Sequence, residues 1–136
     1  MTALHDGHDP DTPPGAEAAL ATLAEQLDDA REHLRRARDL EVAAKHRLGD
    51  ARRRARFSAD CPKAGVFGGV RTTVADVEAW LDDQVADEDL THELATAARQ
   101  AAADHLRTLG QQLSAQQSIS RSVGNDFAGT RGTWPS

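Results

Sequence analysis

Apolar residues recur along residues 16–57 at alternating steps of three and four, which is the spacing of a coiled-coil helix. Ten of the eleven seam positions in this stretch are apolar, and Glu41 is the exception. The seam positions are Leu20, Leu23, Leu27, Ala30, Leu34, Ala37, Glu41, Ala44, Leu48, Ala51 and Ala55. No proline interrupts them, and Gly49 is the only glycine. The pattern predicts one long helix over 16–57, with alanines that let a partner helix approach closely.

A second helix is predicted over 73–123. Thr73 is suited to cap its first turn, and Asp76 follows at the position where a carboxylate favours the helix dipole. The polar run DDQVADED at 82–89 is expected to bend or interrupt the helix. Gly124 supplies a residue that can end it. Its apolar stripe contains several steps of four and drifts from a strict heptad, with the members Leu90, Leu94, Ala98, Ala102, Leu106, Leu109, Leu113 and Val123.

The remaining segments are expected to lack regular structure. Residues 58–72 hold one proline and three glycines and predict a loop. Residues 1–15 hold three prolines and little to bury, so we expect a disordered tail, and residues 124–136 are expected to form a second tail. The apolar residues of the loop are expected to fold back as a small cap on the end of the hairpin: Val66, Phe67 and Val70.

Two long helices joined by a short loop predict an all-α fold, a coiled-coil-like antiparallel hairpin. Aromatic residues make up only 4% of the 136-residue chain. A core of leucine and alanine is thin, so we expect the hairpin to self-associate or to pack against another helical protein. The leucines expected to form this interaction seam are Leu20, Leu23, Leu27, Leu34, Leu48, Leu90, Leu94, Leu106, Leu109 and Leu113.

Charge is segregated along the chain. Residues 31–56 carry ten basic and four acidic side chains, whereas residues 73–93 carry eight acidic and no Lys or Arg. An antiparallel hairpin places these two stretches side by side, so the basic cluster has an acidic complement within the chain. The expected basic members are Arg47, Arg52, Arg53, Arg54 and Arg56, and the expected acidic members are Asp76, Glu78, Asp82, Asp83, Asp87 and Glu88. Pairing of this kind sets register and orientation more than it adds stability.

Nucleic-acid contact is the alternative for arginines that point away from the second helix. The residues that could contact phosphates in this way are Arg31, Arg35, Arg38, Arg52 and Arg56. A net charge of −6 and the lack of aromatic residues among these arginines count against this alternative.

Catalytic and metal-binding patterns are weak. Cys61 is the only cysteine, so no internal disulfide can form, and the HDGHD stretch at 5–9 falls in a predicted tail. Neither His92 nor His105 belongs to a zinc-binding HExxH motif. We therefore expect no enzyme activity, no cofactor, no metal site and no small-molecule substrate. No apolar run approaches 18 residues, which predicts a soluble protein of the bacterial cytoplasm with no membrane partner.

A resemblance rests on the stretches RTTVADVEAWLDDQV at 71–85 and LRTLGQQLSAQQSISRSV at 106–123. In this layout an Ala-rich helix with basic residues leads to a Thr-initiated second helix that ends in a Leu, Gln and Ser segment. It resembles small helical proteins encoded by phages and prophages, often among early genes for DNA recombination and replication. The resemblance implies an accessory role beside proteins of DNA metabolism, and it carries over no catalytic residue.

Three functions follow from the sequence. The first is a non-enzymatic helical interaction protein that self-associates and contacts a protein of DNA metabolism. The second is direct nucleic-acid binding through the arginines of the first helix. The third is a virion or scaffolding component, which predicts large oligomers that grow with concentration.

Overall fold

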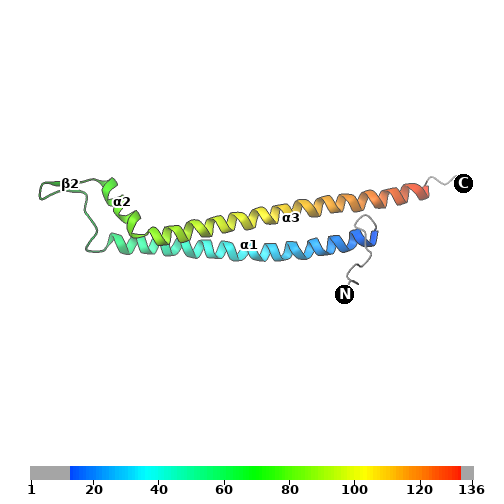
Figure 1. Cartoon of the computed structure of the whole chain (residues 1–136), viewed down its shortest axis with the longest axis horizontal. Helices are drawn as coiled ribbons and strands as arrows, with labels where there is room; N and C mark the ends of the chain where they lie inside the picture. The colour runs from blue at the N-terminus through cyan, green and yellow to red at the C-terminus, as the bar shows by residue number, and fades with distance from the viewer. Residues whose placement is uncertain (1–12, 133–136) are drawn as a thin grey trace, which may run out of the picture. The chain divides into compact units, whose positions relative to one another are not determined.

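The computed structural model describes residues 13–132 and, within them, the side chains of residues 15–125. Its elements are α1 (Pro13–Arg56), β1 (Gly65–Phe67), β2 (Val70–Thr72), α2 (Val74–Gln84) and α3 (Ala86–Gly132). The long helices α1 and α3 pack antiparallel, and a small β-hairpin and the short helix α2 connect them (Figure 1). The prediction of a helical antiparallel hairpin is therefore confirmed.

The chain divides into two compact units, and α1 and α3 contribute to both. Unit 1 comprises the residues up to Leu34 and those from Ala102 onward, and unit 2 comprises Arg35–Ala101. The core of unit 1 contains Leu27, Ala30 and Leu109. Leu23, Leu106 and Leu113 are half-buried around it. Unit 2 contains the β-hairpin, α2 and the first turns of α3.

Helix α2 begins at a complete capping box. The hydroxyl of Thr73 accepts a hydrogen bond of 3.1 Å from the backbone N–H of Asp76, and the Asp76 carboxylate accepts one of 2.8 Å from the N–H of Thr73. The backbone N–H of Thr73 and, to a smaller extent, its side chain hold the pKa of the Asp76 carboxyl below its ordinary value. Two otherwise orphaned N–H groups are satisfied in this way, which explains why the helix begins where the sequence predicted.

The predicted interruption within 82–89 lies at Val85, between α2 and α3. Leu81 and Val85 are both buried, with 0% and 2% of their surface exposed. The Val85 N–H still bonds the Leu81 carbonyl at 3.2 Å, and the Val85 carbonyl accepts from Asp89 at 2.8 Å. The helical path is therefore broken at a single residue that remains packed, whereas the acidic side chains before and after it stay in solvent.

Three predictions about the connecting and terminal segments were wrong. The 58–72 segment contains the β1–β2 hairpin, in which Phe67 pairs with Val70 and Val66 with Arg71. Helix α3 continues through Gly124 to Gly132, because glycine within a helix costs only about 1 kcal/mol relative to alanine and does not have to end it. Helix α1 begins at Pro13, a residue whose fixed φ suits a first turn. The rest of the predicted N-terminal tail, and residues 133–136 of the C-terminal one, lie outside the described residues.

Candidate interaction surface

The seam of α3 keeps a strict heptad, contrary to the drifting stripe predicted from the sequence. The α3 side chains that are buried or half-buried at seam positions are Glu88, His92, Ala95, Arg99, Ala102, Leu106, Leu109, Leu113, Gln116, Ser120 and Val123. These positions alternate steps of four and three without interruption. The prediction failed because it followed leucines, whereas the first half of the true seam is mostly polar. On α1, all eleven predicted seam positions are buried or half-buried.

In unit 2 the seam contains an ion pair in place of leucines. Nε of Arg99 donates to a carboxylate oxygen of Glu41 at 2.9 Å. The side chains of Arg99 and Glu41 are 32% and 22% exposed, so they lie at the border of the helix contact. The hydrogen bond from Arg99 holds the pKa of the Glu41 carboxyl below its ordinary value. The only polar residue in the predicted α1 seam thus has a specific partner across the seam.

The large apolar side chains at the start of α3 lie outside the seam. Leu90 and Leu94 are 54% and 62% exposed, which contradicts their prediction as seam residues. With the exposed Ala97 and Ala101 they recur at steps of four, three and four, so they form one stripe on the solvent side of α3. We call these four residues the leucine stripe. The stripe is a second heptad on a helix that already has a seam, and no described residue covers it.

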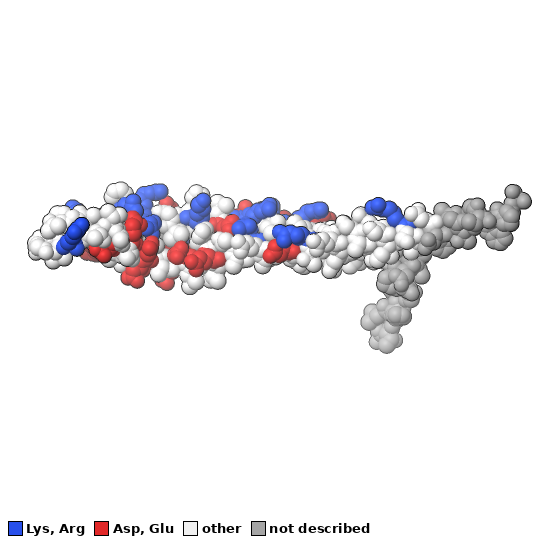
Figure 2. Space-filling model, turned by 90° about the horizontal axis from the view of Figure 1, so that it is seen from above, with Lys and Arg blue, Asp and Glu red and all other residues white. Residues whose placement is uncertain are grey.

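Acidic residues surround the leucine stripe. Asp87 lies one turn before Leu90 on the same face, and Asp89 and Glu93 flank it. All three are exposed, and none forms an ion pair within the described residues. Figure 2 shows acidic side chains gathered over the part of unit 2 that contains α2 and the start of α3. A ligand for this surface must therefore be apolar in its centre and basic at its edge.

The arginine cluster of α1 does reach the acidic segment, through two of its members. Arg52 donates to Asp82 at 2.6 Å and also to Glu78, which in turn accepts from Arg56 at 3.4 Å. Asp82 and Glu78 raise the already high pKa of the Arg52 guanidinium further. Arg47 lines a hollow together with Asp87 and Glu88. Two arginines of the α1 cluster are thus paired with carboxylates of α2, and these ion pairs help to fix the register between α1 and α2.

The residues proposed for phosphate contact are mostly engaged elsewhere. Arg52 and Arg56, which were also predicted to pair with the acidic segment, both bind α2. Arg31 pairs with Asp28 at 3.1 Å and Arg35 with Asp39 at 3.1 Å, each within α1. Arg38 is exposed.

The β-hairpin presents an uncovered apolar tip, which sequence analysis wrongly expected to fold back. Val66, Phe67 and Val70 are 67%, 61% and 66% exposed. Gly68 and Gly69 form the two-residue turn with φ of 59° and 82°, angles that suit a tight hairpin and that few other residues adopt. The repeated glycines in GVFGGVRT were the sequence signal for this hairpin. We call Val66, Phe67 and Val70 the hairpin tip.

The ring of Phe67 is positioned by its own strand. A Cβ at Gly65 would lie 3.1 Å from Cε2 of Phe67, so the ring rests close above the glycine backbone. Phe67 and Val70 are directly paired and therefore share one face of the hairpin, with Val66 and Arg71 on the other. Lys63 and Arg71 are exposed beside the tip, and the sequence holds no Asp or Glu between Asp60 and Asp76.

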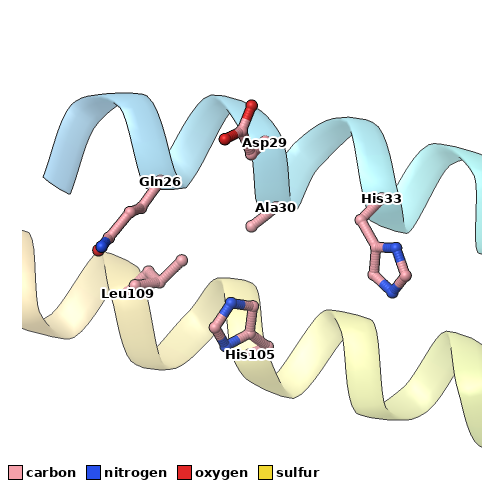
Figure 3. A pocket seen from close by; sticks show the side chains of 6 residues that line it. All are labelled: Gln26, Asp29, Ala30, His33, His105 and Leu109. Carbon is pink, nitrogen blue, oxygen red and sulfur yellow. The ribbon is translucent and has the colours of Figure 1, made fainter. Parts of the chain in front are cut away.

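The hollow in unit 1 does not form a metal centre. His33 and His105 reach into it from opposite helices, beside Gln26 and Leu109, whereas the carboxylate of Asp29 points away (Figure 3). Within the described side chains, no group of three or more His, Cys, Asp or Glu could hold a metal ion. The HDGHD stretch at 5–9 lies outside the described residues.

Comparison with protein-family models, with curated proteins and with solved structures found no match. The resemblance to small phage proteins therefore stays a prediction. No helix among the described residues is both long enough and apolar enough to cross a membrane.

Proposed function

We propose that the protein is a non-enzymatic helical assembly protein that self-associates through unit 2. One observation carries this proposal: in the part of α3 that belongs to unit 2, the charged Arg99 lies in the seam, whereas the apolar Leu90 and Leu94 are exposed to solvent. Isolated exposed leucines are common, but two exposed leucines that continue with Ala97 and Ala101 at steps of three and four form an apolar stripe that a partner helix or loop can cover.

The charges of unit 2 favour another copy of the same chain as the partner. The acidic residues around the leucine stripe have no ion pairs within the described residues, and the same holds for Arg38, Lys45 and Arg54 of α1 and for Lys63 and Arg71 near the hairpin. One chain therefore offers both an acidic and a basic surface for intermolecular contact. Complementary potentials of this kind select partners and orientation.

Sedimentation velocity over a wide concentration range tests this function. We expect the wild-type sedimentation coefficient to rise with concentration and the Leu90→Gln/Leu94→Gln variant to remain monomeric. Burial of two leucines contributes roughly 3 kcal/mol or more, so association should weaken about 100-fold or more. Ile119→Gln is the matched control, since Ile119 is an exposed apolar residue of α3 in unit 1. A monomeric wild type, or a double variant that still associates, would refute the proposal.

The same runs with a short single-stranded oligonucleotide at low salt test direct nucleic-acid binding. We expect no change in mass, because four of the five candidate arginines already form ion pairs. A shift reversed by salt would favour phosphate contact instead. An accessory role in DNA recombination or replication remains a proposal, and it rests on the resemblance alone.

A further inference from the structure

We infer that the leucine stripe of one copy receives the hairpin tip of a second copy, so that subunits join head to side. This inference rests on the proposed self-association and names the two surfaces that meet. It follows from three properties of the tip and the stripe: their apolar content, their charges and their geometry.

The hairpin is an unusual element to leave uncovered. A two-stranded hairpin alone is marginally stable in water, and it needs a third strand or a packed face. Here the strands have three residues each, and of their side chains only Thr72 is not exposed. The apolar pair of Phe67 and Val70 therefore lacks the packed partner that such a hairpin needs within its own chain. A contact from another subunit supplies one.

The charges around the two surfaces are opposite. Lys63 and Arg71 are exposed next to the tip, Arg71 from the face of the hairpin that carries Val66, whereas the leucine stripe is flanked by Asp87, Asp89 and Glu93. Two stripes packed against each other would instead crowd these carboxylates together. The α1 surface around Leu40 and Val42 is also basic, but Asp39 lies within it. The tip is thus an apolar surface of unit 2 whose basic neighbours complement the acidic edge of the stripe.

The geometry of the two surfaces allows this pairing. Leu90 and Leu94 lie one helical turn apart on the exposed side of α3, so an apolar side chain of a partner can pack between them. Phe67 and Val70 share one exposed face of the hairpin, and the ring of Phe67 lies close to Gly65. Phe67 is the residue we assign to the space between the two leucines, with Val70 beside it.

A contact between two different surfaces does not pair a subunit with itself. After one such contact the pair still has one unused tip and one unused stripe, so assembly continues as a ring or an open chain. The inference therefore connects to the scaffolding alternative, because it predicts oligomers that grow with concentration and have no fixed size.

A mixing experiment with full-length chains tests the inference. We expect Phe67→Ser/Val70→Ser and Leu90→Gln/Leu94→Gln each to be monomeric, with association weakened about 100-fold or more. Mixed in equal amounts, they retain one intact tip and one intact stripe and should form a heterodimer that does not grow. All four altered side chains are exposed, so both variants should melt like the wild type. Val66→Ser, on the opposite face of the hairpin, is the matched control and should assemble normally.

The outcomes separate this inference from the proposed function. If the stripe variant is monomeric but the tip variant still assembles, self-association stands and the tip is not its partner. If both variants are monomeric and their mixture does not form a heterodimer, head-to-side contact is also overturned. A charge test gives an independent measurement: Lys63→Glu should weaken assembly, and Asp87→Lys/Glu93→Lys mixed with it should restore association.

Discussion

The two units have the same pair of antiparallel helices and opposite distributions of leucine. In unit 1, Leu27 and Leu109 are 5% and 6% exposed, and further leucines pack against them. In unit 2, the seam contains small and charged residues, and Leu90 and Leu94 lie in solvent. A continuous heptad of seam positions therefore does not determine which of these positions are apolar. Unit 1 buries leucines of both long helices, whereas unit 2 buries Leu81 of α2 and leaves Leu90 and Leu94 of α3 in solvent.

The largest effect should come from removing a leucine of the unit 1 core. We expect Leu109→Ala to lower the free energy of unfolding by about 3 kcal/mol, because it removes buried contacts and leaves a cavity. Leu94→Ala is the matched control in unit 2 and should change stability by less than about 0.5 kcal/mol. Urea unfolding followed by circular dichroism, at a concentration where the protein is monomeric, measures both. Equal losses for the two variants would remove the distinction between the units.

A smaller effect is expected at the cap of α2. Thr73→Ala removes the hydroxyl that accepts from the Asp76 N–H, and we expect a loss of about 1 kcal/mol. Thr73→Ser keeps the acceptor and should retain nearly all of the stability. Hydrogen exchange of the α2 amides should report the loss, with little change in the core of unit 1. A loss of protection in both units would contradict independent behaviour of α2.

Replacement of the polar seam sharpens the comparison from the other side. We expect Glu41→Leu/Arg99→Leu to raise the urea midpoint, since apolar replacement of a paired charge is often neutral or stabilising. Arg99→Leu alone should lower it, because Glu41 then loses its hydrogen bond at 2.9 Å. The rise should be smaller than the fall caused by Leu109→Ala. A double variant less stable than Arg99→Leu would indicate that the ion pair contributes more to stability than the packing of two leucines would.

The smallest effect is on the titration of Glu41. Its folded pKa lies below the ordinary 4.5, so the stabilisation is complete above that pH and is lost as the pH falls through the folded value. We expect Arg99→Gln to raise the pKa of Glu41 toward 4.5 and to reduce the pH dependence of stability in that range. Carbon-detected NMR of the carboxyl group measures the shift. An unchanged pKa would show that Arg99 does not hold this carboxylate in solution.

Much of the fold could be predicted from the sequence. The α1 seam has a clear period, and the signals at Thr73 and Asp76 act over a few residues, so both were readable without the structure. The prediction failed where leucines lie outside the seam and charged residues lie within it. Leu90 and Leu94 were wrongly assigned to the seam, because apolar character alone cannot distinguish a seam from an exposed apolar stripe. Glu41 appeared as a defect in one helix, and only its distant partner Arg99 explains it.

The candidate surfaces were harder to foresee for the same reason. The hairpin tip was expected to cover the end of the helical hairpin. Leu81 and Val85 are buried there instead, and Phe67 is exposed to solvent. Pairing between the arginine cluster and the acidic segment was predicted correctly. Of the five predicted arginines, Arg52 and Arg56 form ion pairs with α2.

The break at Val85 also has a consequence for motion within unit 2. Helix α2 has its own cap at Thr73, ends at Gln84 and has Leu81 as its only buried side chain. Such a segment can open and reclose while the longer helices stay folded, as a small cooperative unit of low local stability. Its amide protons should therefore exchange with solvent well before those around Leu109, on a timescale set by α2 and the Arg52 ion pairs alone.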